Sequence, residues 1–350
     1  MGLVQHYPAL NRPSAPVCSV CIANYNGVAL LADCLESVLA QLGGFSIEII
    51  VHDDASTDGS VSWLRANYPQ IELLASEQNA GFCVSNNRMV ERARGKYVLL
   101  LNNDAALLPD ALSWLLETAS AQDAPGILTL PQYDWASGKL VDRGCGLDLF
   151  YNPVPNIDPT RHEVAMVIGA CMFLPRELWI DLGGFPAWLG SIGEDLYLCC
   201  LARLRGFKVQ AVAASGYRHR QGTSFGGNRA IAGQWSTTFR RRRLSERNKS
   251  YALVIFTPTL LLWPLLACHL VSLLLEGVAL TLIHRDRRIL LEIYVNTLTS
   301  LLHARKMLCA RRTAVRKPAH VGSGAYLRAF SLVPRKLVML ARLGIPRITR

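Results

Sequence analysis

The sequence lacks the short motifs that identify several large classes of nucleotide-binding enzyme. No G-x-G-x-x-G string follows the first predicted strand, which argues against a nicotinamide or flavin enzyme. No glycine-rich loop with a lysine follows that strand either, so a nucleotidyltransferase is a poor fit. Internal repeats and low-complexity tracts are also absent. A chain of 350 residues is compatible with a single α/β domain that carries a helical extension.

Acidic residues are scarce in the second part of the chain. Residues 1–217 carry 13 Lys/Arg against 22 Asp/Glu, whereas residues 218–350 carry 24 against 4. Such a division of charge indicates contact with nucleic acid or with a membrane. The basic part is interleaved with a long apolar run and contains no recognisable nucleic-acid module. An anionic membrane surface is therefore the expected partner, and no nucleic acid is expected.

The first residues show no basic segment followed by an apolar one, so no secretory signal is predicted. The ten cysteines are therefore interpreted as reduced thiols of a cytosolic protein. Cys18 and Cys21 form a C-x-x-C pair inside an apolar run that looks like a strand. Residues three apart on a strand point to opposite faces, so we expect these two to be core residues and not to share a metal.

Short β-branched runs alternate with helical segments from Val17 to about Leu130. The runs are Val17–Ala23, Ile47–His52, Ile71–Ala75 and Tyr97–Leu101, with periodic segments such as Leu30–Ala40 and Val61–Asn67 between them. This alternation predicts a mostly parallel sheet with helices on both faces. Ligands of such sheets bind beyond the carboxyl ends of the strands, so the residues that follow each run are candidates for the site.

Polar strings follow the first two predicted strands. In the first, N-Y-N-G, Tyr25 offers an aromatic ring that can stack on a nucleobase. In the second, H-D-D-A-S-T-D-G-S, Asp53 is expected to accept hydrogen bonds from a base or from a ribose hydroxyl. Ser56 or Thr57 is expected to cap the next helix, and Asp58 suits the first turn of that helix.

A third string, Asn102-Asn103-Asp104, ends a buried strand in oxygen-rich side chains. Mg²⁺ and Mn²⁺ take one or two carboxylates together with substrate phosphates, so the string is a candidate metal site. An ordinary turn before the helix near Pro109 is the alternative. His219 is a candidate for a further metal ligand, although a lone histidine is more often structural.

Two adjacent carboxylates, Glu194 and Asp195, open a helix predicted over about Glu194–Arg205. They complement the positive end of the helix dipole. One of them is also a candidate for a general base, because it could remove the proton from an attacking hydroxyl.

Residues Tyr251–Ile283 form a 33-residue apolar run in which only Glu276 is ionised. The run is long enough to span a bilayer. Pro258 and Pro264 are expected to break it, which favours helices lying in the membrane interface or a shallow hairpin. A true span and a buried helix pair stay open. Residues 301–350 carry twelve Lys/Arg and no Asp/Glu, and such a tail can bind anionic headgroups.

Together these strings resemble family 2 of the glycosyltransferases, an inverting group with the GT-A fold. The match leans toward the rhamnosyltransferase-like members of bacterial cell-envelope polysaccharide synthesis. It covers about Cys18–Gly222 and continues more loosely to about Arg312. The motifs, in the family's order, are S-V-C-I-A-N-Y-N-G, I-I-V-H-D-D-A-S-T-D-G-S, N-A-G-F-C-V-S-N-N, L-L-L-N-N-D, and G-G-F followed by G-E-D.

The resemblance implies a role for each matching position. Tyr25 and Asp53 would hold the base and the ribose. Asp104 would bind the metal and the diphosphate, assisted by His219. Asp195, next to Glu194, would be the catalytic base. The other positions implied to bind the nucleotide sugar are Ala23, Asn79, Gly81, Asn87, Asn102 and Asn103.

Two positions depart from the family pattern. Asn102 replaces the first acidic residue of the usual D-x-D metal motif, which puts the metal affinity in question. Tyr197 stands where the family commonly has a further acidic residue. A catalytically weak nucleotide-sugar-binding subunit is therefore the alternative to an enzyme.

The expected architecture is an α/β GT-A domain over residues 1–240, followed by a C-terminal helical extension. The nucleotide-sugar half of the GT-A domain is expected at about 17–130 and the acceptor half at about 131–240. Residues 241–350 are expected to form a basic, apolar, membrane-docking region.

The expected activity is transfer, with inversion, of a hexosyl or rhamnosyl group from a dTDP-, UDP- or GDP-linked donor. The expected cofactor is Mg²⁺ or Mn²⁺, and the expected acceptor is a glycan or a lipid-linked molecule. The expected location is the cytoplasmic face of the cell membrane, as a peripheral or monotopic protein.

Overall fold

The computed structural model describes residues 2–122, 124, 126–222, 227–231, 234–317 and 320–349. The chain forms two compact units. Unit 1 consists of residues 1–145, 155–202 and 207–221, and unit 2 consists of residues 146–154, 203–206 and 222–350.

An eight-stranded sheet forms the centre of unit 1, in the order β1-β4-β3-β2-β5-β12-β7-β13. The bounds are β1 Val4–Tyr7, β2 Cys18–Asn24, β3 Ile47–Asp53, β4 Glu72–Ser76, β5 Tyr97–Asn102, β7 Gly126–Thr129, β12 Cys171–Pro175 and β13 Lys208–Ala211. Strands β4, β3, β2 and β5 are parallel neighbours, and each coincides within a residue or two with one of the four predicted runs. The prediction of a mostly parallel sheet is therefore confirmed for this half of unit 1.

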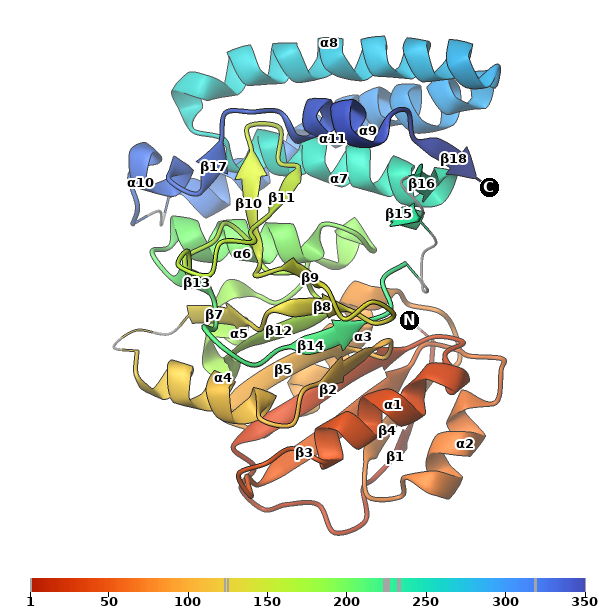
Figure 1. Ribbon diagram of the computed structural model, residues 1–350, viewed down its shortest axis with the longest axis vertical. Helices are drawn as coiled ribbons and strands as arrows, with labels where there is room; N and C mark the ends of the chain where they lie inside the picture. Colours follow the sequence, from red (N-terminus) through yellow and green to blue (C-terminus); the bar gives the residue numbers. More distant parts are fainter. Residues whose placement is uncertain are drawn as a thin grey trace. The chain divides into compact units, whose positions relative to one another are not determined.

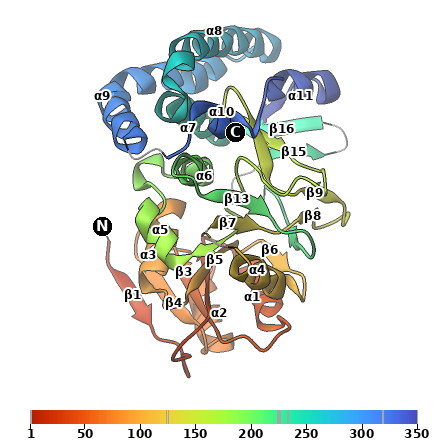
Figure 2. The same ribbon diagram turned by 90° about the vertical axis from the view of Figure 1, so that its left-hand side faces the viewer.

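Helices cover both faces of this sheet (Figures 1 and 2). The helices of unit 1 are α1 Val28–Leu39, α2 Ser60–Asn67, α3 Phe82–Arg92, α4 Ala111–Ser120, α5 Arg176–Leu182 and α6 Glu194–Leu204. Alternate residues of β2 point to opposite faces. Val20 and Ile22 share a core with α1, α2 and α4, whereas α3 contacts β2 and β3 from the other side. Cys18 and Cys21 follow the same alternation as buried free thiols, as predicted.

Unit 1 also contains antiparallel strand pairs and a second sheet, neither of which the sequence predicts. Strand β1 pairs antiparallel with β4, and β12 pairs antiparallel with β5 and with β7. A second, smaller sheet has the order β6-β14-β8-β9. Its bounds are β6 Ala105–Leu107, β8 Gln132–Asp134, β9 Leu140–Asp142 and β14 Tyr217–His219.

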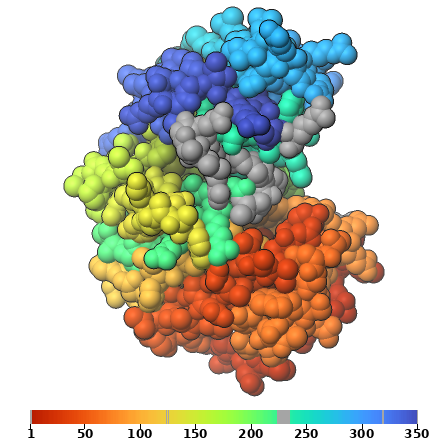
Figure 3. Space-filling model, turned by 45° about the vertical axis from the view of Figure 1, so that its right-hand side comes forward, coloured from red at the N-terminus to blue at the C-terminus, as the bar shows by residue number. Residues whose placement is uncertain are grey.

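Unit 2 is built mainly from helices. Its longer helices are α7 Phe239–Phe256, α8 Thr259–His284 and α9 Asn296–Arg316. Its shorter helices are the π-helix Ile289–Val295, α10 Ser323–Leu327 and α11 Arg335–Leu343. Small strand groups join distant parts of this unit, with the bounds β10 Cys145–Asp148, β11 Pro153–Pro155, β15 Gly227–Ile231, β16 Gln234–Thr238, β17 Phe330–Ser331 and β18 Arg347–Thr349. The surface view shows the residues of α8 and of the C-terminal segment bordering each other (Figure 3).

The two prolines of the apolar run behave differently from one another. Pro258 separates α7 from α8, as expected, because a helix ends before a residue that cannot donate a backbone hydrogen bond. Pro264 lies inside α8, and the helix continues through it to His284, so the expectation of a break there is wrong. Pro264 is the sixth residue of α8, beyond the first four amide groups that have no intrahelical partner, so the helix continues there with one backbone hydrogen bond fewer.

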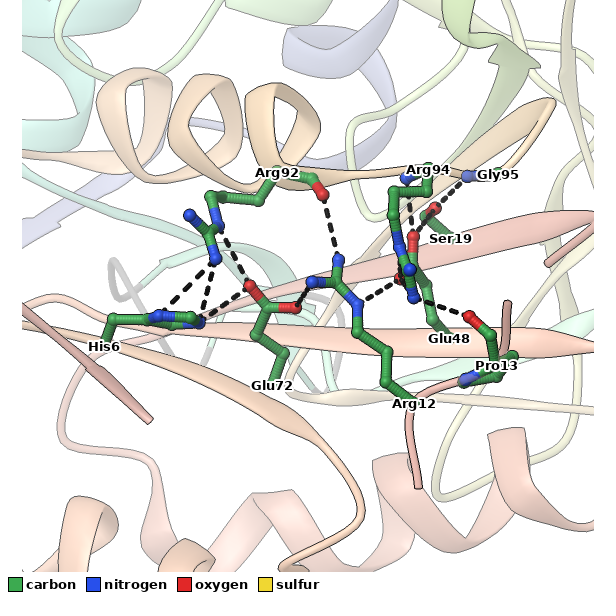
Figure 4. Close-up of polar contacts among 9 residues, drawn as sticks. All are labelled: His6, Arg12, Pro13, Ser19, Glu48, Glu72, Arg92, Arg94 and Gly95. Atoms are coloured by element: carbon green, nitrogen blue, oxygen red, sulfur yellow. Dashed lines mark hydrogen bonds and ion pairs between the residues drawn. The ribbon is translucent and has the colours of Figure 1, made fainter. Parts of the chain in front are cut away.

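A network of charged side chains closes the amino-terminal edge of the main sheet in unit 1 (Figure 4). The buried carboxylate of Glu48 accepts hydrogen bonds from Ser19 Oγ and from the Arg94 amide, both at 2.6 Å. Arg12 forms ion pairs with Glu48 at 3.0 Å and with Glu72 at 2.7 Å. Because these groups lie at the edge opposite to the carboxyl ends of the strands, we assign them to stability.

Candidate active site

The carboxyl ends of three parallel strands meet at one edge of the main sheet. In the strand register Asn24 of β2 is opposite Asp53 of β3, and Ala23 is opposite Asn102 of β5. Residues that follow different strands in the sequence are therefore brought to one place. This is the edge at which open α/β sheets bind their ligands.

Asp53 is held by its neighbours on this edge. Its Oδ2 accepts a hydrogen bond from Asn24 Nδ2 at 2.8 Å, and its Oδ1 accepts one from the Ser56 amide at 2.9 Å. Asn24 Oδ1 in turn accepts a hydrogen bond from Asn103 Nδ2 at 2.7 Å. Asp53 is only 1% exposed. A carboxylate has about four lone-pair positions, so these two bonds orient Asp53 and leave acceptor capacity for a ligand.

The turn after β2 needs glycine because of this network. A Cβ atom at Gly27 would lie 2.2 Å from Asn103 Nδ2 and 2.6 Å from Asn24 Oδ1. Any side chain at this position would therefore displace the amide pair that orients Asp53. Tyr25, in the same turn, is 55% exposed, so its ring is available to stack on a flat ligand.

The expectation that Ser56 or Thr57 caps helix α2 is wrong. Helix α2 starts after Gly59 and has no side-chain cap. Ser56 Oγ instead accepts a hydrogen bond from the Asn26 amide, and the Thr57 amide donates to Asn26 Oδ1. Asp58 accepts a hydrogen bond from the Val28 amide at 2.9 Å. These contacts join two loops across the strand ends. Asp58 Oδ1 also accepts a hydrogen bond from the amide of Ser60, the first residue of α2, at 3.0 Å, so Asp58 supports the start of this helix as expected.

Asp54 has a positioning role that the sequence reasoning missed. Its two carboxylate oxygens accept hydrogen bonds from the amides of Ala80 and Gly81, at 2.7 and 2.8 Å. The residue is 5% exposed, and it ties the end of β3 to the loop before α3. The signal in the sequence was the adjacent pair Asp53-Asp54. Neighbouring residues in extended backbone point to opposite sides, so the two carboxylates have different partners.

The three positions implied to line the donor pocket from this loop and from α3 differ in their surroundings. Asn79 is exposed. Gly81 has a φ of 88°, a conformation that favours glycine. Asn87 uses both ends of its amide on one residue, donating to the Phe185 carbonyl at 2.7 Å and accepting from the Phe185 amide at 3.0 Å. Asn87 thereby fixes the G-G-F loop.

The candidate metal ligands Asp104 and His219 lie together. Strand β14 pairs with β6 so that His219 is opposite Ala105, the residue after Asp104. His219 Nε2 is 3.1 Å from Asp104 Oδ1, and both side chains are buried. Their positions in the sequence are far apart, and the smaller sheet brings them together.

Gln132 determines which ring nitrogen of His219 carries the proton. Gln132 Oε1 accepts a hydrogen bond from the Tyr217 hydroxyl at 2.7 Å and lies 3.1 Å from His219 Nδ1. His219 Nδ1 is therefore the protonated nitrogen, and in the neutral ring Nε2 presents its lone pair toward Asp104. Metal-binding histidines commonly donate their other ring N–H in this way.

Asp142 lies behind Gln132 and was not predicted. It accepts a hydrogen bond from the Gly144 amide at 2.9 Å and lies 3.4 Å from Gln132 Nε2. Burial raises the pKa of Asp142 to about 7, against the smaller opposing effects of the Gly144 amide and of His219. Neither Gln132 nor Asp142 belongs to a recognisable motif, so only the fold reveals them.

The donor set of Asp104 and His219 fits a divalent metal. Two ligands at adjacent corners of an octahedron with bonds of about 2.1 Å are about 3.0 Å apart, close to the observed 3.1 Å. Within the described residues, no group of three or more His, Cys, Asp or Glu side chains is placed to hold a metal. Two protein ligands leave the remaining positions for phosphate oxygens and water, as is usual for Mg²⁺.

Asp195 lies at the same edge as Asn102. The backbone amide of Gly169 donates to Asp195 Oδ2 at 3.1 Å, and the carbonyl of the next residue, Ala170, accepts from the Asn102 amide at 3.0 Å. Asp195 is partly exposed at the first turn of α6, whereas Glu194 is 7% exposed. Of the two carboxylates, Asp195 is thus the better placed to meet a substrate.

The backbone before α6 is strained. Ile192 has a φ of 69° and Gly193 a φ of 95°. A β-branched residue rarely adopts positive φ, and such strain tends to occur where a function requires a fixed geometry. Tyr197, one turn further along, packs edge-on against Trp188 with ring centroids 5.8 Å apart. The position that departs from the family pattern therefore has a packing role here.

Comparison with known proteins gives a consistent picture. Residues 19–182 match the family model described as glycosyl transferase family 2. The chain is 28% identical over 280 residues to the uncharacterized protein y4gI of Sinorhizobium fredii, covering 75% of this chain and 30% of that protein. It is 31% identical over 118 residues to the succinoglycan biosynthesis protein ExoO of Rhizobium meliloti, covering 33% of each. The chain spans about a third of the length of these curated relatives.

Among solved structures, the chain is similar to the mannosyltransferase PcManGT from Pyrobaculum calidifontis, solved in complex with GDP-Man and Mn²⁺. The TM-score is 0.50 at 16% sequence identity, with 92% of this chain and 88% of that chain covered. At this identity the likeness shows the fold alone. The chain thus has the predicted GT-A fold with a C-terminal helical region, and residues 19–182 match the family 2 glycosyltransferase model.

Proposed function

We propose that this chain transfers a sugar from a nucleotide diphosphate donor to a hydroxyl group of a glycan or lipid-linked acceptor, with inversion at the anomeric carbon. The observation that carries the proposal is the meeting of Asp53, Asp104 and Asp195 at one edge of a GT-A sheet. Each comes from a different part of the chain. Hydrogen bonds orient the carboxylates of Asp53 and Asp195, and Asp104 Oδ1 lies 3.1 Å from His219 Nε2.

The comparisons support this proposal in two ways. ExoO is named for the biosynthesis of succinoglycan, which favours a polysaccharide product. PcManGT was solved with GDP-Man and Mn²⁺, which favours a nucleotide-sugar donor and a divalent metal. We extend the proposal to a dTDP-, UDP- or GDP-linked hexose or rhamnose, and to cell-envelope polysaccharide synthesis at the cytoplasmic face of the membrane.

The donor would be held at both of its ends. Asp53 accepts hydrogen bonds from the base or the ribose, and the exposed ring of Tyr25 stacks on the base. Asn102 and Asn103, at and just after the end of β5, would contact the donor. When bound, Mg²⁺ or Mn²⁺ on Asp104 and His219 supplies positive charge that stabilises the leaving diphosphate. Gln132 keeps His219 in the tautomer that this task needs.

Asp195 would act as the general base. Its carboxylate removes the proton from the acceptor hydroxyl as the hydroxyl oxygen forms a bond to the anomeric carbon. The bond from that carbon to the diphosphate oxygen breaks at the same time, and its electron pair leaves with the nucleoside diphosphate. Attack from the side opposite to the leaving group inverts the configuration at this carbon.

A nucleotide-sugar-binding subunit without turnover is the second candidate. Two observations favour it, namely Asn102 at the first position of the metal motif and the packed ring of Tyr197 in place of an acidic residue. Both candidates bind the donor, so binding alone does not separate them.

The experiment is to incubate the purified chain with a panel of nucleotide sugars and to measure nucleoside diphosphate release, with Mn²⁺ and with a chelator. The proposal expects release from at least one donor that depends on the metal. Donor binding by calorimetry with no release from any donor, with or without an acceptor extract, would favour the binding subunit instead.

A further inference from the structure

Helix α8 buries one narrow stripe and exposes the rest of its surface. The buried positions are Leu262, His269, Leu273, Gly277 and Leu280, spaced at three, four or seven residues. Such spacing marks a single side of a helix. Only 22% of the most apolar stretch of this helix is buried.

The exposed side of α8 carries no Asp, Glu, Lys or Arg between Thr259 and Ile283. Its large apolar side chains and their exposed fractions are Leu260 92%, Trp263 72%, Val271 55%, Leu275 67%, Leu282 71% and Ile283 52%. Surface leucines scattered singly are normal, but a continuous apolar side over a 26-residue helix is not. The helix therefore has the surface of an element that is covered by an apolar partner.

Buried contacts hold α8 against the other helices of unit 2. Glu276, in the second half of the helix, forms ion pairs with Arg242 of α7 at 2.5 Å and with Lys336 of α11 at 2.6 Å. His269 is 2.7 Å from Ser250 Oγ of α7. A Cβ atom at Gly277 would lie 2.8 Å from Tyr294, so the helices approach closely there.

These ties exclude a transmembrane orientation of α8 in the folded chain. A helix that crossed the bilayer would carry Glu276, Arg242 and Lys336 into the hydrocarbon region or would have to break their ion pairs. Both are costly, because charged groups are strongly disfavoured at the bilayer centre. Lying in the plane of the interface requires neither.

Helix α11 also turns apolar side chains outward. It is amphipathic, yet none of its residues is buried. Lys336 points inward to Glu246 at 2.8 Å and to Glu276, while Leu337 and Leu340 are 61% and 48% exposed. An amphipathic helix normally turns its apolar side to the core. Here the cation faces inward and the leucines face outward.

Positive charge accompanies these apolar sides. Arg285 and Arg287 follow α8 at exposed positions, and Arg342 is exposed on α11. Residues 301–350 contain no acidic side chain. Anionic headgroups attract such residues near the membrane surface. The charge therefore matches an anionic bilayer better than a second copy of this equally basic unit.

We propose that the outward sides of α8 and α11 form a docking face that lies in the interface of an anionic bilayer, with α8 parallel to the membrane plane. The docking face is defined by its exposed apolar residues Leu260, Trp263, Val271, Leu275, Leu282, Leu337 and Leu340. Lipid binding is a property of unit 2 and does not depend on the proposed sugar transfer. It is measured without donor or acceptor.

The test is flotation of the purified chain with vesicles of phosphatidylcholine alone and with vesicles that also contain phosphatidylglycerol. We expect binding to the anionic vesicles only, with the bound fraction falling as salt is raised. The double variant Leu275→Ser with Leu282→Ser should reduce the affinity at least about tenfold, since each buried CH₂ contributes about 0.8 kcal/mol.

The matched control is Leu10→Ser with Leu42→Ser, two leucines of unit 1 that are each 60% exposed. This variant should bind vesicles like the wild type. Circular dichroism and thermal melting of both variants separate loss of binding from loss of folding. Equal binding by the two double variants, or equal binding to both vesicle types, would overturn the proposal.

The same vesicles test how deeply α8 inserts and whether another partner covers the docking face. Trp263 fluorescence, obtained by difference from the Trp263→Phe variant, should be quenched by lipids brominated near the headgroup and little by lipids brominated near the bilayer centre. Strong quenching at the centre would show a span and overturn the in-plane orientation. Dimers in light scattering without vesicle binding, or retention on DNA at physiological salt without vesicle binding, would overturn the bilayer as the occupant.

Discussion

At the scale of single residues, the site depends on side chains that touch no substrate. Asn24 and Asn103 orient Asp53, Asp54 fixes the loop at Gly81, and Gln132 orients His219. Buried polar groups of this kind are stabilised only when each has a partner. The chemistry of the edge therefore depends on a second layer of amides that fixes the carboxylates and the imidazole.

Substitution of Gln132 tests the role of this second layer in metal binding. Gln132→Met keeps the volume but removes the acceptor for His219 Nδ1, so the ring is no longer held in one tautomer. We expect Mn²⁺ affinity, measured by electron paramagnetic resonance or calorimetry without donor, to fall about 10- to 100-fold. The control Gln70→Met alters an exposed glutamine before β4 and should leave the affinity unchanged. Equal Mn²⁺ affinity in the two variants would remove Gln132 from the account.

Asp142 predicts a pH dependence of stability. Burial, its largest cause, raises the pKa of Asp142 from 3.8 to about 7, so the folded chain holds a proton that the unfolded chain releases. This contribution to stability is present at acidic pH and is lost as the pH rises from about 4 to about 7. Asp142→Asn removes it.

We therefore expect the unfolding free energy of the wild type, relative to Asp142→Asn, to fall by more than about 1.4 kcal/mol across this window, the value of one pKa unit. Urea unfolding at a series of pH values measures the difference. A constant difference between pH 4 and 7 would show that the Asp142 carboxyl is not perturbed.

At the scale of elements, local pattern was sufficient for the strands that build the nucleotide edge. The runs of β2, β3, β4 and β5 are continuous, β-branched and separated by periodic helices, so their existence and their parallel direction follow from the sequence. The polar residues at their ends were predicted for the same reason. The glycosyltransferase fold brings these ends together in the way the pattern indicates.

The elements that complete the metal site could not be predicted in this way. Strand β14 is three residues long, and its partners β6 and β8 lie about 110 and 85 residues earlier in the chain. Short strands carry little periodicity, and no local signal specifies a distant partner. Asp104 and His219 were predicted separately as ligands, but Gln132 and Asp142 became visible only with the fold.

The charged network at the other edge of the sheet predicts a stability effect without loss of activity. Glu48→Gln removes the anionic partner of Arg94 and leaves Arg12 with Glu72 alone. Breaking a buried pair costs about 3–5 kcal/mol, and we expect about 2 kcal/mol here because both arginines are partly exposed. The control Glu91→Gln, exposed on α3, should cost less than about 0.5 kcal/mol.

Urea unfolding measures the difference between these two variants, and donor binding at 25 °C should be unchanged in both. A loss of donor affinity in Glu48→Gln greater than its loss of stability explains would contradict the assignment of this edge to stability.

At the scale of the whole molecule, the sequence predicts two regions with different partners, an acidic first part and a basic, apolar second part. Composition cannot reveal which side of a helix faces outward. The run at 251–283 looks uniform in sequence, yet its first part lies in the mostly buried helix α7 and its second part forms α8, which is mostly exposed. The ion pairs of Glu276 with Arg242 and Lys336 distinguish the orientations that the sequence left open.

The central claim is that Asp195 is the base of a sugar transfer, and substitution of this residue tests it most directly. The measurement is nucleoside diphosphate release under acceptor saturation, together with donor affinity by calorimetry, for Asp195→Asn and for the control Glu177→Gln, which is exposed on α5. We predict a loss of turnover of about 100-fold or more with donor affinity within about twofold of wild type, and an unchanged control. Turnover by Asp195→Asn at the wild-type rate would contradict the account.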